Sequence, residues 1–174
     1  MFALARPIRV VLAVALLFAG TLPSVASDED NERAPNFRAR TMDGQSFNNA
    51  SVKGKVVLLQ FWTTWCPVCK SEEHLLDAID KEFAPRGLIV LAIDVGEGKK
   101  TVKKYLQEHP RTVRIVLNDD TNLAAMYAAD AYPVYVVIDR EGNIAATQRG
   151  GGGEGALRGL LASAGLETDY QSKP

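Results

Sequence analysis

The alternation of apolar and polar stretches divides the chain into segments of two kinds. Short, almost continuous apolar runs rich in β-branched residues, such as VVLLQFW at 56–62 and LIVLAID at 88–94, are typical of strands covered on both faces. Between them, apolar residues recur at helical spacing from Leu75 to Phe83, in a segment that ends before Gly87. Strands that alternate with helices predict an α/β fold with a mixed central sheet and helices on both faces.

The same patterns predict the remaining elements and two hairpins. Asp43-Gly44 is a turn signal within a weakly alternating N-terminal stretch, and the turn at 140–143 is short enough to join its two strands as an antiparallel pair. Along the chain, the predicted helices run from near Cys66 to the stop at Pro85, from Lys99 to His109, from Thr121 to Ala129 and from Glu154 to Leu166, and the predicted strands cover residues 56–62, 88–94, 113–118, 134–139 and 144–150.

The N-terminal segment has the pattern of an export signal. Arg6 and Arg9 form a basic start, an apolar or small-residue run covers Val10–Gly20, and the small residues that end at Ala26 fit a cleavage site. The apolar run is about 13 residues long at most, whereas a membrane-spanning helix needs roughly 20. We therefore predict a signal peptide at 1–26 and a periplasmic location, with an uncleaved membrane anchor as the alternative.

Removal of the signal would leave 174 − 26 = 148 residues, which suits one domain with a full core. The signal carries two of the 20 basic residues and none of the 21 acidic ones, so the remaining net charge is 18 − 21 = −3. This balance gives no support to binding of nucleic acid or of anionic membranes. We divide the rest of the chain into a flexible lead-in at 27–34, a folded domain at 35–166 and a frayed C-terminal tail at 167–174.

The candidate chemistry centres on Cys66 and Cys69, the two cysteines of the chain, in the sequence CPVC. Disulfides of exported proteins are usually structural, but a bridge across two residues closes too small a loop to restrict the unfolded chain much. A closed zinc site would need four ligands. Of the two histidines, His74 falls on the solvent side of its predicted helix and His109 stands at a helix end. We therefore predict no metal and no cofactor.

Redox exchange fits the position of the pair better. Cys66 stands at a predicted helix start, where free backbone N–H groups favour the thiolate, and Pro67 suits the first helical turn. The helix end alone would lower a thiol pKa from about 8.5 to about 7, so stronger activation would need hydrogen bonds to the sulfur, for instance from the Cys69 thiol or the amide of residue 68 or 69. Cys69 lies one turn further in, so we predict that Cys66 attacks a substrate disulfide and Cys69 resolves the mixed disulfide.

Glu72 is the third catalytic candidate. At 100° per residue it shares a helix face with Leu76, Ile79 and Phe83, so it should point inward beneath the cysteines. A carboxyl group in an apolar setting holds its proton longer, which suits proton transfer during dithiol exchange. The alternative is an ordinary surface glutamate near a helix start. Glu73, about 100° further round, is predicted to be such a surface residue.

Taken together, these features resemble the thioredoxin superfamily, and more narrowly the exported TlpA/ResA/CcmG-like thiol-disulfide oxidoreductases. WCPVCK ends an apolar strand, Glu72 is interior, and Tyr132-Pro133 precedes another apolar strand. The stretches APNFRARTMDG, LIVLAID and YPVYVVIDREGNI also match stretches that such proteins carry in this order. The resemblance covers about Ala34 to Leu166 and implies a thioredoxin-like fold with an N-terminal hairpin extension.

The resemblance also implies roles for the residues around the cysteines. Pro133 matches a proline that the family holds in the cis form beside the redox pair. The backbone of Tyr132 would bind substrate, and its side chain would border the groove. Trp65, Pro67 and Val68 would complete the substrate-binding surface.

Three positions depart from the family pattern. Gln60 stands six residues before Cys66, where thioredoxin itself has a buried aspartate, so proton handling would fall more heavily on Glu72. His74 stands where many members have a proline that kinks the helix. Pro67-Val68 replaces the Gly-Pro or Glu-Pro common among the reducing members, which leaves the redox potential open.

The resemblance favours a monomeric reductant of disulfides in selected exported proteins, of the cytochrome c or copper-centre maturation type, recharged by a membrane electron-relay protein. A disulfide oxidase or isomerase of exported proteins stays open, as does a non-catalytic binding module or metal chaperone. A peroxiredoxin-type peroxidase is disfavoured because Leu59 stands where its proline should be and Cys69 follows in CxxC spacing. Gly150–Gly153 lacks the Lys-Ser/Thr of a phosphate loop and is predicted to be a flexible connection.

Overall fold

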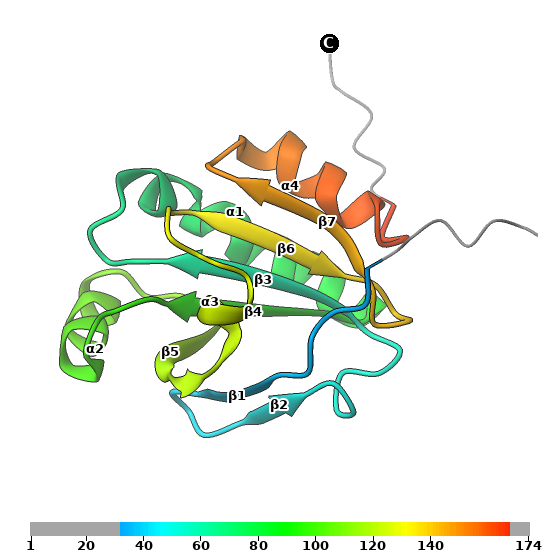
Figure 1. Cartoon of the computed structure of the whole chain (residues 1–174). Helices are drawn as coiled ribbons and strands as arrows, with labels where there is room; N and C mark the ends of the chain where they lie inside the picture. The colour runs from blue at the N-terminus through cyan, green and yellow to red at the C-terminus, as the bar shows by residue number, and fades with distance from the viewer. Residues whose placement is uncertain (1–31, 168–174) are drawn as a thin grey trace, which may run out of the picture.

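The computed structural model describes residues 32–167, whose strands form one sheet of seven (Figure 1). The predicted signal peptide, most of the predicted lead-in and nearly all of the predicted tail lie outside these residues. Within residues 32–167, no helix is both long enough and apolar enough to cross a membrane. The described residues include the whole of the predicted domain at 35–166.

The sheet is mixed, as the alternation of strands and helices predicted. Its spatial order is β2-β1-β5-β4-β3-β6-β7. The central strand β3 runs parallel to β4, and β4 runs parallel to β5, whereas β6 and β7 are antiparallel neighbours on one side and β1 and β2 form the N-terminal hairpin on the other. The strands are β1 (Arg38–Thr41), β2 (Ser46–Asn48), β3 (Val56–Trp62), β4 (Leu88–Asp94), β5 (Arg114–Thr121), β6 (Val134–Ile138) and β7 (Ile144–Arg149).

The helices follow the strands in the predicted order. They are α1 (Pro67–Phe83), the short 3-10 helix η1 (Ala84–Arg86), α2 (Lys99–Glu108), α3 (Leu123–Met126) and α4 (Gly153–Ala162). The stop predicted near Pro85 corresponds to η1, which ends at Gly87 in a left-handed conformation with φ 91°. The chain then enters β4.

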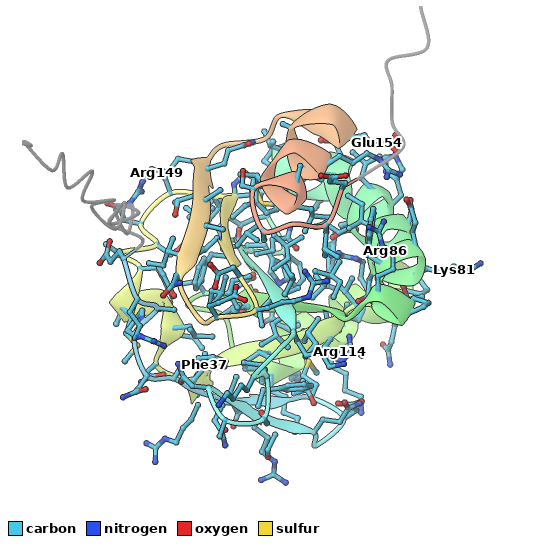
Figure 2. All side chains as sticks on the ribbon, turned by 90° about the vertical axis from the view of Figure 1, so that its right-hand side faces the viewer. Phe37, Lys81, Arg86, Arg114, Arg149 and Glu154 are labelled. Atoms are coloured by element: carbon cyan, nitrogen blue, oxygen red, sulfur yellow. A yellow bond between two sulfur atoms is a disulfide. The ribbon has the colours of Figure 1, made fainter. Side chains whose placement is uncertain are left out.

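Alternate residues of β3 face two separate apolar cores. Even-numbered apolar residues of β3 pack with α1, α2 and α4, which contribute Leu76, Val102 and Leu157 to the first core. Odd-numbered residues face a second core, which α3 and the chain around Phe37 cover. Figure 2 views the sheet end-on and shows Phe37 on the side away from α1. Helices thus lie on both faces, as predicted, but one face carries three of them and the other a single short helix.

The predicted boundary between β5 and α3 was wrong because a distant strand extends β5. Thr121 pairs with Ala39 of β1, so the strand continues three residues beyond the predicted end at 118. The helix predicted at 121–129 is consequently reduced to Leu123–Met126, and Ala128, with φ 45°, lies outside the helical region of the backbone.

The predicted last helix, Glu154–Leu166, was too long at its C-terminal end. The helix α4 covers Gly153–Ala162, and Gly165 then adopts a left-handed conformation with φ 73°. The Leu166 N–H donates to the carbonyl of Leu161, which is the closing bond of a glycine-terminated helix. Leu166 itself is buried in the first core, so the turn folds the chain back onto the protein.

Candidate active site

Cys66 lies just past the carboxyl end of the central strand and at the start of α1. The strand β3 ends at Trp62, a short turn follows, and Cys66 caps the helix that Pro67 begins. Proline fits this place because the first helical position needs no backbone donor. Cys66 and Cys69 form a disulfide with their Cα atoms 5.3 Å apart, so the structure shows the oxidised form of the pair.

The sulfur of Cys66 accepts a hydrogen bond from the backbone N–H of Cys69 at 3.1 Å. An amide donor within the first turn was one of the hydrogen bonds predicted for this sulfur, and the structure shows that bond in the oxidised pair. Cys69 is fully buried and Cys66 is 3% exposed. Cys66 is therefore the accessible edge of the pair, and the N–H of Cys69 lies behind its sulfur.

Apolar side chains form an exposed rim beside the disulfide. Trp65 is 65% exposed and Val68 45% exposed, and Pro67 between the cysteines is exposed as well. Trp65 packs edge-on against Tyr132, with ring centroids 5.9 Å apart. The peptide bond from Tyr132 to Pro133 is cis. The structure thus brings together the residues for which the resemblance implied substrate binding.

Glu72 points inward, as its helix face predicted, and is 5% exposed. Its surroundings are polar, however, and not apolar as the helix face suggested. The Tyr135 hydroxyl donates to Oε2 at 2.6 Å, and the N–H groups of Gly152 and Gly153 donate to Oε1 at 2.8 and 2.7 Å. Three donors therefore converge on one buried carboxylate and satisfy its negative charge.

The hydrogen bonds continue from Glu72 into the sheet. Tyr135 of β6 is the strand partner of Gln60 in β3, and Gln60 Nε2 lies 3.4 Å from the Tyr135 hydroxyl, to which it donates. Burial first, and then the hydrogen bond to Glu72 and its charge, raise the pKa of Tyr135, so the hydroxyl keeps its proton. Gln60 thus supports Glu72 through Tyr135. Nothing in the sequence singles out Tyr135 beyond its place in an apolar strand.

The glycine run at 150–153 lies against the start of α1. The Gly150 N–H donates to the carbonyl of Pro133 at 2.8 Å, and the two following amides bind Glu72 as described. A Cβ on Gly151 would lie 2.5 Å from Cγ1 of Val68 and 2.8 Å from Oε1 of Glu72, so glycine is needed for this close approach. The run connects β7 to α4, as predicted, and its amides also bind the cis-proline loop and Glu72.

Glu73 is buried, contrary to the prediction of a surface residue. It accepts a hydrogen bond from the Tyr105 hydroxyl at 2.7 Å, and its carboxylate lies 3.5 Å from Nη1 of Arg111. Tyr105 belongs to α2, which packs against this side of α1. The periodicity of α1 alone cannot show that a second helix covers its flank.

Both histidines lie where the sequence placed them. His74 is exposed on α1, and His109 caps the end of α2, where its ring stacks on Tyr105 with centroids 4.4 Å apart. Across residues 32–167, no three histidine, cysteine, aspartate or glutamate side chains gather in a group that could hold a metal ion.

A further buried carboxyl group lies at the end of β4. Asp94 is the strand partner of Trp62 and is fully buried, and no other described residue donates a hydrogen bond to its oxygens. Burial first, and then the hydrogen bond to Glu97 and its charge, raise the pKa of Asp94 from 3.8 to about 8. Glu97 in turn accepts bonds from the backbone N–H and the hydroxyl of Thr64, at 2.5 and 2.7 Å.

The Asp94–Glu97 pair helps to fix the turn that presents Cys66, because Thr64 lies two residues before that cysteine. Partial burial acts to raise the pKa of Glu97, but the bonds from Thr64 and Asp94 outweigh it and leave that pKa lowered. Asp94 therefore carries the proton and Glu97 the negative charge at neutral pH. The one signal for this pair in the sequence is the acid that closes the apolar run LIVLAID.

Asp94→Asn is expected to flatten the pH dependence of stability. The folded chain keeps the Asp94 proton up to about pH 8, whereas the unfolded chain loses it near pH 4. The wild-type free energy of unfolding therefore falls as pH rises through this window, by at most about 1.4 kcal/mol per pH unit from this group. Asparagine does not titrate and can still donate to Glu97. Denaturant unfolding across the window should show a shallower decline in the variant; parallel curves would contradict the assignment.

A cysteine pair at a helix start, over a mixed sheet and beside a cis-proline loop, is the arrangement of thioredoxin-like thiol-disulfide oxidoreductases, and the chain is an enzyme of this class. Residues 31–147 match the family model described as the AhpC/TSA family. The chain belongs to that family.

Similar proteins carry names of the same class. The thiol-disulfide oxidoreductase ResA of Bacillus subtilis is 31% identical over 128 residues, which are 74% of this chain and 69% of that protein. A thiol:disulfide interchange protein of the thioredoxin family from Chlorobium tepidum, a solved structure, is 27% identical with a TM-score of 0.68 and covers 79% of this chain and 99% of its own. StoA of Bacillus subtilis, at 22% identity and a TM-score of 0.64 over 73% of this chain and 96% of its own, shares the fold.

Proposed function

We propose that the enzyme is an exported reductant, which transfers two electrons from a Cys66–Cys69 dithiol to disulfides of selected exported proteins. The buried carboxylate of Glu72 is the observation that supports this direction of electron transfer. Its hydrogen-bonded carboxylate lies one helical turn beyond Cys69, and a negative charge there opposes thiolate formation in the pair. Strong oxidants of this class have a stabilised reduced form. Because the Glu72 charge destabilises the thiolate of the reduced cysteine pair, the pair gives up its electrons more readily. This favours reduction of the substrate disulfide.

Reduction would proceed in two sulfur transfers. The Cys66 thiolate attacks a substrate disulfide, forms a mixed disulfide and releases one substrate thiolate. The Cys69 thiol then loses its proton, and its sulfur attacks Cys66. This attack breaks the mixed disulfide, releases the second substrate thiolate and leaves the Cys66–Cys69 disulfide that the structure shows. The Cys69 proton passes to Glu72 and from there to a released substrate thiolate, so charge and protons balance.

The exposed rim supports a polypeptide as the substrate. We assign substrate binding to Trp65, Pro67 and Val68, whose exposed apolar surface suits the residues around a disulfide, and to the Tyr132-Pro133 backbone. The class of substrate would be cytochrome c precursors or copper-centre assembly proteins. A membrane electron-relay protein would reduce the disulfide again, and the enzyme would act as a periplasmic monomer after removal of residues 1–26.

The reduction potential of the cysteine pair tests the direction. Equilibration of the full chain with thiol–disulfide buffers at neutral pH should give a value well below about −200 mV. A value near about −120 mV would make the enzyme an oxidase. Glu72→Gln removes the opposing charge and should therefore raise the potential, whereas an unchanged potential would remove the argument for direction from Glu72.

A further inference from the structure

Helix α2 presents a row of lysines to solvent, while Val102 and Tyr105 face the core. The exposed lysines of α2 are Lys99, Lys100, Lys103 and Lys104. Lys70 of α1 is also exposed and extends the row, because its Nζ lies 5.3 Å from the centre of the Tyr105 ring. We call these five residues the lysine face.

Most charges of the lysine face are electrostatically unfavourable for α2, the helix that carries them. Lys99 and Lys100 occupy the first turn, where the positive end of a helix favours acidic residues, and that turn has none. Each of them also repels the lysine one turn further on, Lys103 or Lys104. Among the ion pairs of residues 32–167, none involves a lysine. Within α2, only Lys104 has an opposite charge one turn away, on Glu108, so helix stability does not account for the other three lysines of α2.

The lysine face adjoins the redox site. Glu97, at the entry to α2, binds both the backbone N–H and the hydroxyl of Thr64, which precedes Cys66 by two residues. On the other side of the pair, Lys70 follows Cys69 directly. Figure 1 shows α2 at the end of the sheet where β3 and β4 finish, beside the loop that leads into α1. A protein that presents a disulfide to Cys66 would therefore lie close to these lysines.

We propose that the lysine face is an electrostatic docking surface for substrate proteins that carry acidic residues beside the reactive disulfide. This inference rests on the proposed function. The attraction is local, since the formal net charge of the chain is −1. A protein fits better than an anionic membrane, because the face adjoins Cys66 and the exposed Trp65. A bilayer seated there would block the approach of a substrate.

Two peptide substrates of equal length test the proposal. Each has one internal disulfide, which glutamates flank in the first peptide and lysines in the second. We expect the reduced full chain to reduce the acidic peptide about ten-fold faster at low salt. The difference should vanish near 1 M salt, where the screening length is about 3 Å. Equal rates at low salt would overturn the proposal.

Matched double variants locate the effect. K103E/K104E changes the lysine face, and K53E/K55E makes the same change of charge at two exposed positions just before β3, at the other end of that strand from Cys66. Only K103E/K104E should lose the preference for the acidic peptide. Its melting temperature should change little, because two repulsive lysine pairs one turn apart become attractive while the favourable Lys104–Glu108 spacing becomes repulsive. A similar loss in both variants would show an effect of net charge and overturn the proposal.

A neutral substrate separates failure of docking from failure of the proposed function. Hydroxyethyl disulfide reports on the redox chemistry alone and should react equally with the wild type and both variants. If the wild type does not reduce it, the proposed function fails. Docking is then judged by fluorescence anisotropy with labelled peptides whose thiols are blocked, where the acidic peptide should bind more tightly at low salt. Lysine-dependent binding to phosphatidylglycerol vesicles, without a preference for the acidic peptide, would assign the face to membranes and overturn the proposal.

Discussion

Replacing Cys66 with alanine is expected to lower the rate of disulfide reduction by roughly a thousand-fold or more. Cys66 is the edge of the pair that solvent reaches, and its sulfur faces the Cys69 N–H. Cys69 is fully buried and cannot take over the first attack. Cys69→Ala should retain that attack and stop at the mixed disulfide, because the resolving thiol is missing. Non-reducing electrophoresis after mixing each variant with an extract of exported proteins distinguishes the two.

The two cysteine variants should therefore differ in whether they form mixed disulfides. Cys69→Ala should form adducts with particular proteins, which dithiothreitol releases, and Cys66→Ala should form none. Adducts formed by Cys66→Ala alone would reverse the assignment of attacking and resolving thiols. An absence of adducts from both variants would favour a non-catalytic binding module.

The central strand and the start of α1 could be predicted because their signals are local. A strand with an unbroken apolar run such as VVLLQFW must be buried on both faces of the sheet. The two faces of β3 are buried in the two apolar cores. Pro67 fits the first helical position and few others, so it fixed the start of α1 to within one residue. The position of Cys66 as the helix cap followed from these two facts.

The surroundings of the carboxyl groups could not be predicted because their partners come from distant segments. Glu72 and Glu73 are neighbours on α1, and helix periodicity assigned them opposite environments, yet both are buried. The partners of Glu72 come from β6 and the glycine run, and the partners of Glu73 are Tyr105 of α2 and Arg111, which follows that helix. Asp94 depends on Glu97, which in turn depends on Thr64. Such environments arise where helices and strands pack against one another, and the hydrophobic periodicity of a single helix or strand does not predict them.

Glu72→Gln is expected to slow exchange by about a hundred-fold. The carboxylate accepts three hydrogen bonds through two oxygens, whereas an amide offers one oxygen and turns two donors toward the remaining partners. A neutral amide also cannot take up the Cys69 proton. The second sulfur transfer should therefore slow more than the first. Rapid mixing with a substrate disulfide, followed by acid quenching, measures the lifetime of the mixed disulfide at each pH.

Glu73→Gln is the matched control, because Glu73 is the next residue, is also buried and also has polar partners. Loss of its charge weakens the contacts with Arg111 and Tyr105 and should cost about 1–3 kcal/mol of stability. Its exchange rates should stay close to the wild-type level, since its partners are Tyr105 and Arg111, and neither is hydrogen-bonded to Glu72 or to the cysteines among residues 32–167. Similar stabilities with unequal rates would assign Glu72 to the chemistry. If both variants lose rate in proportion to stability, Glu72 serves only packing, and the proton transfer attributed to it is wrong.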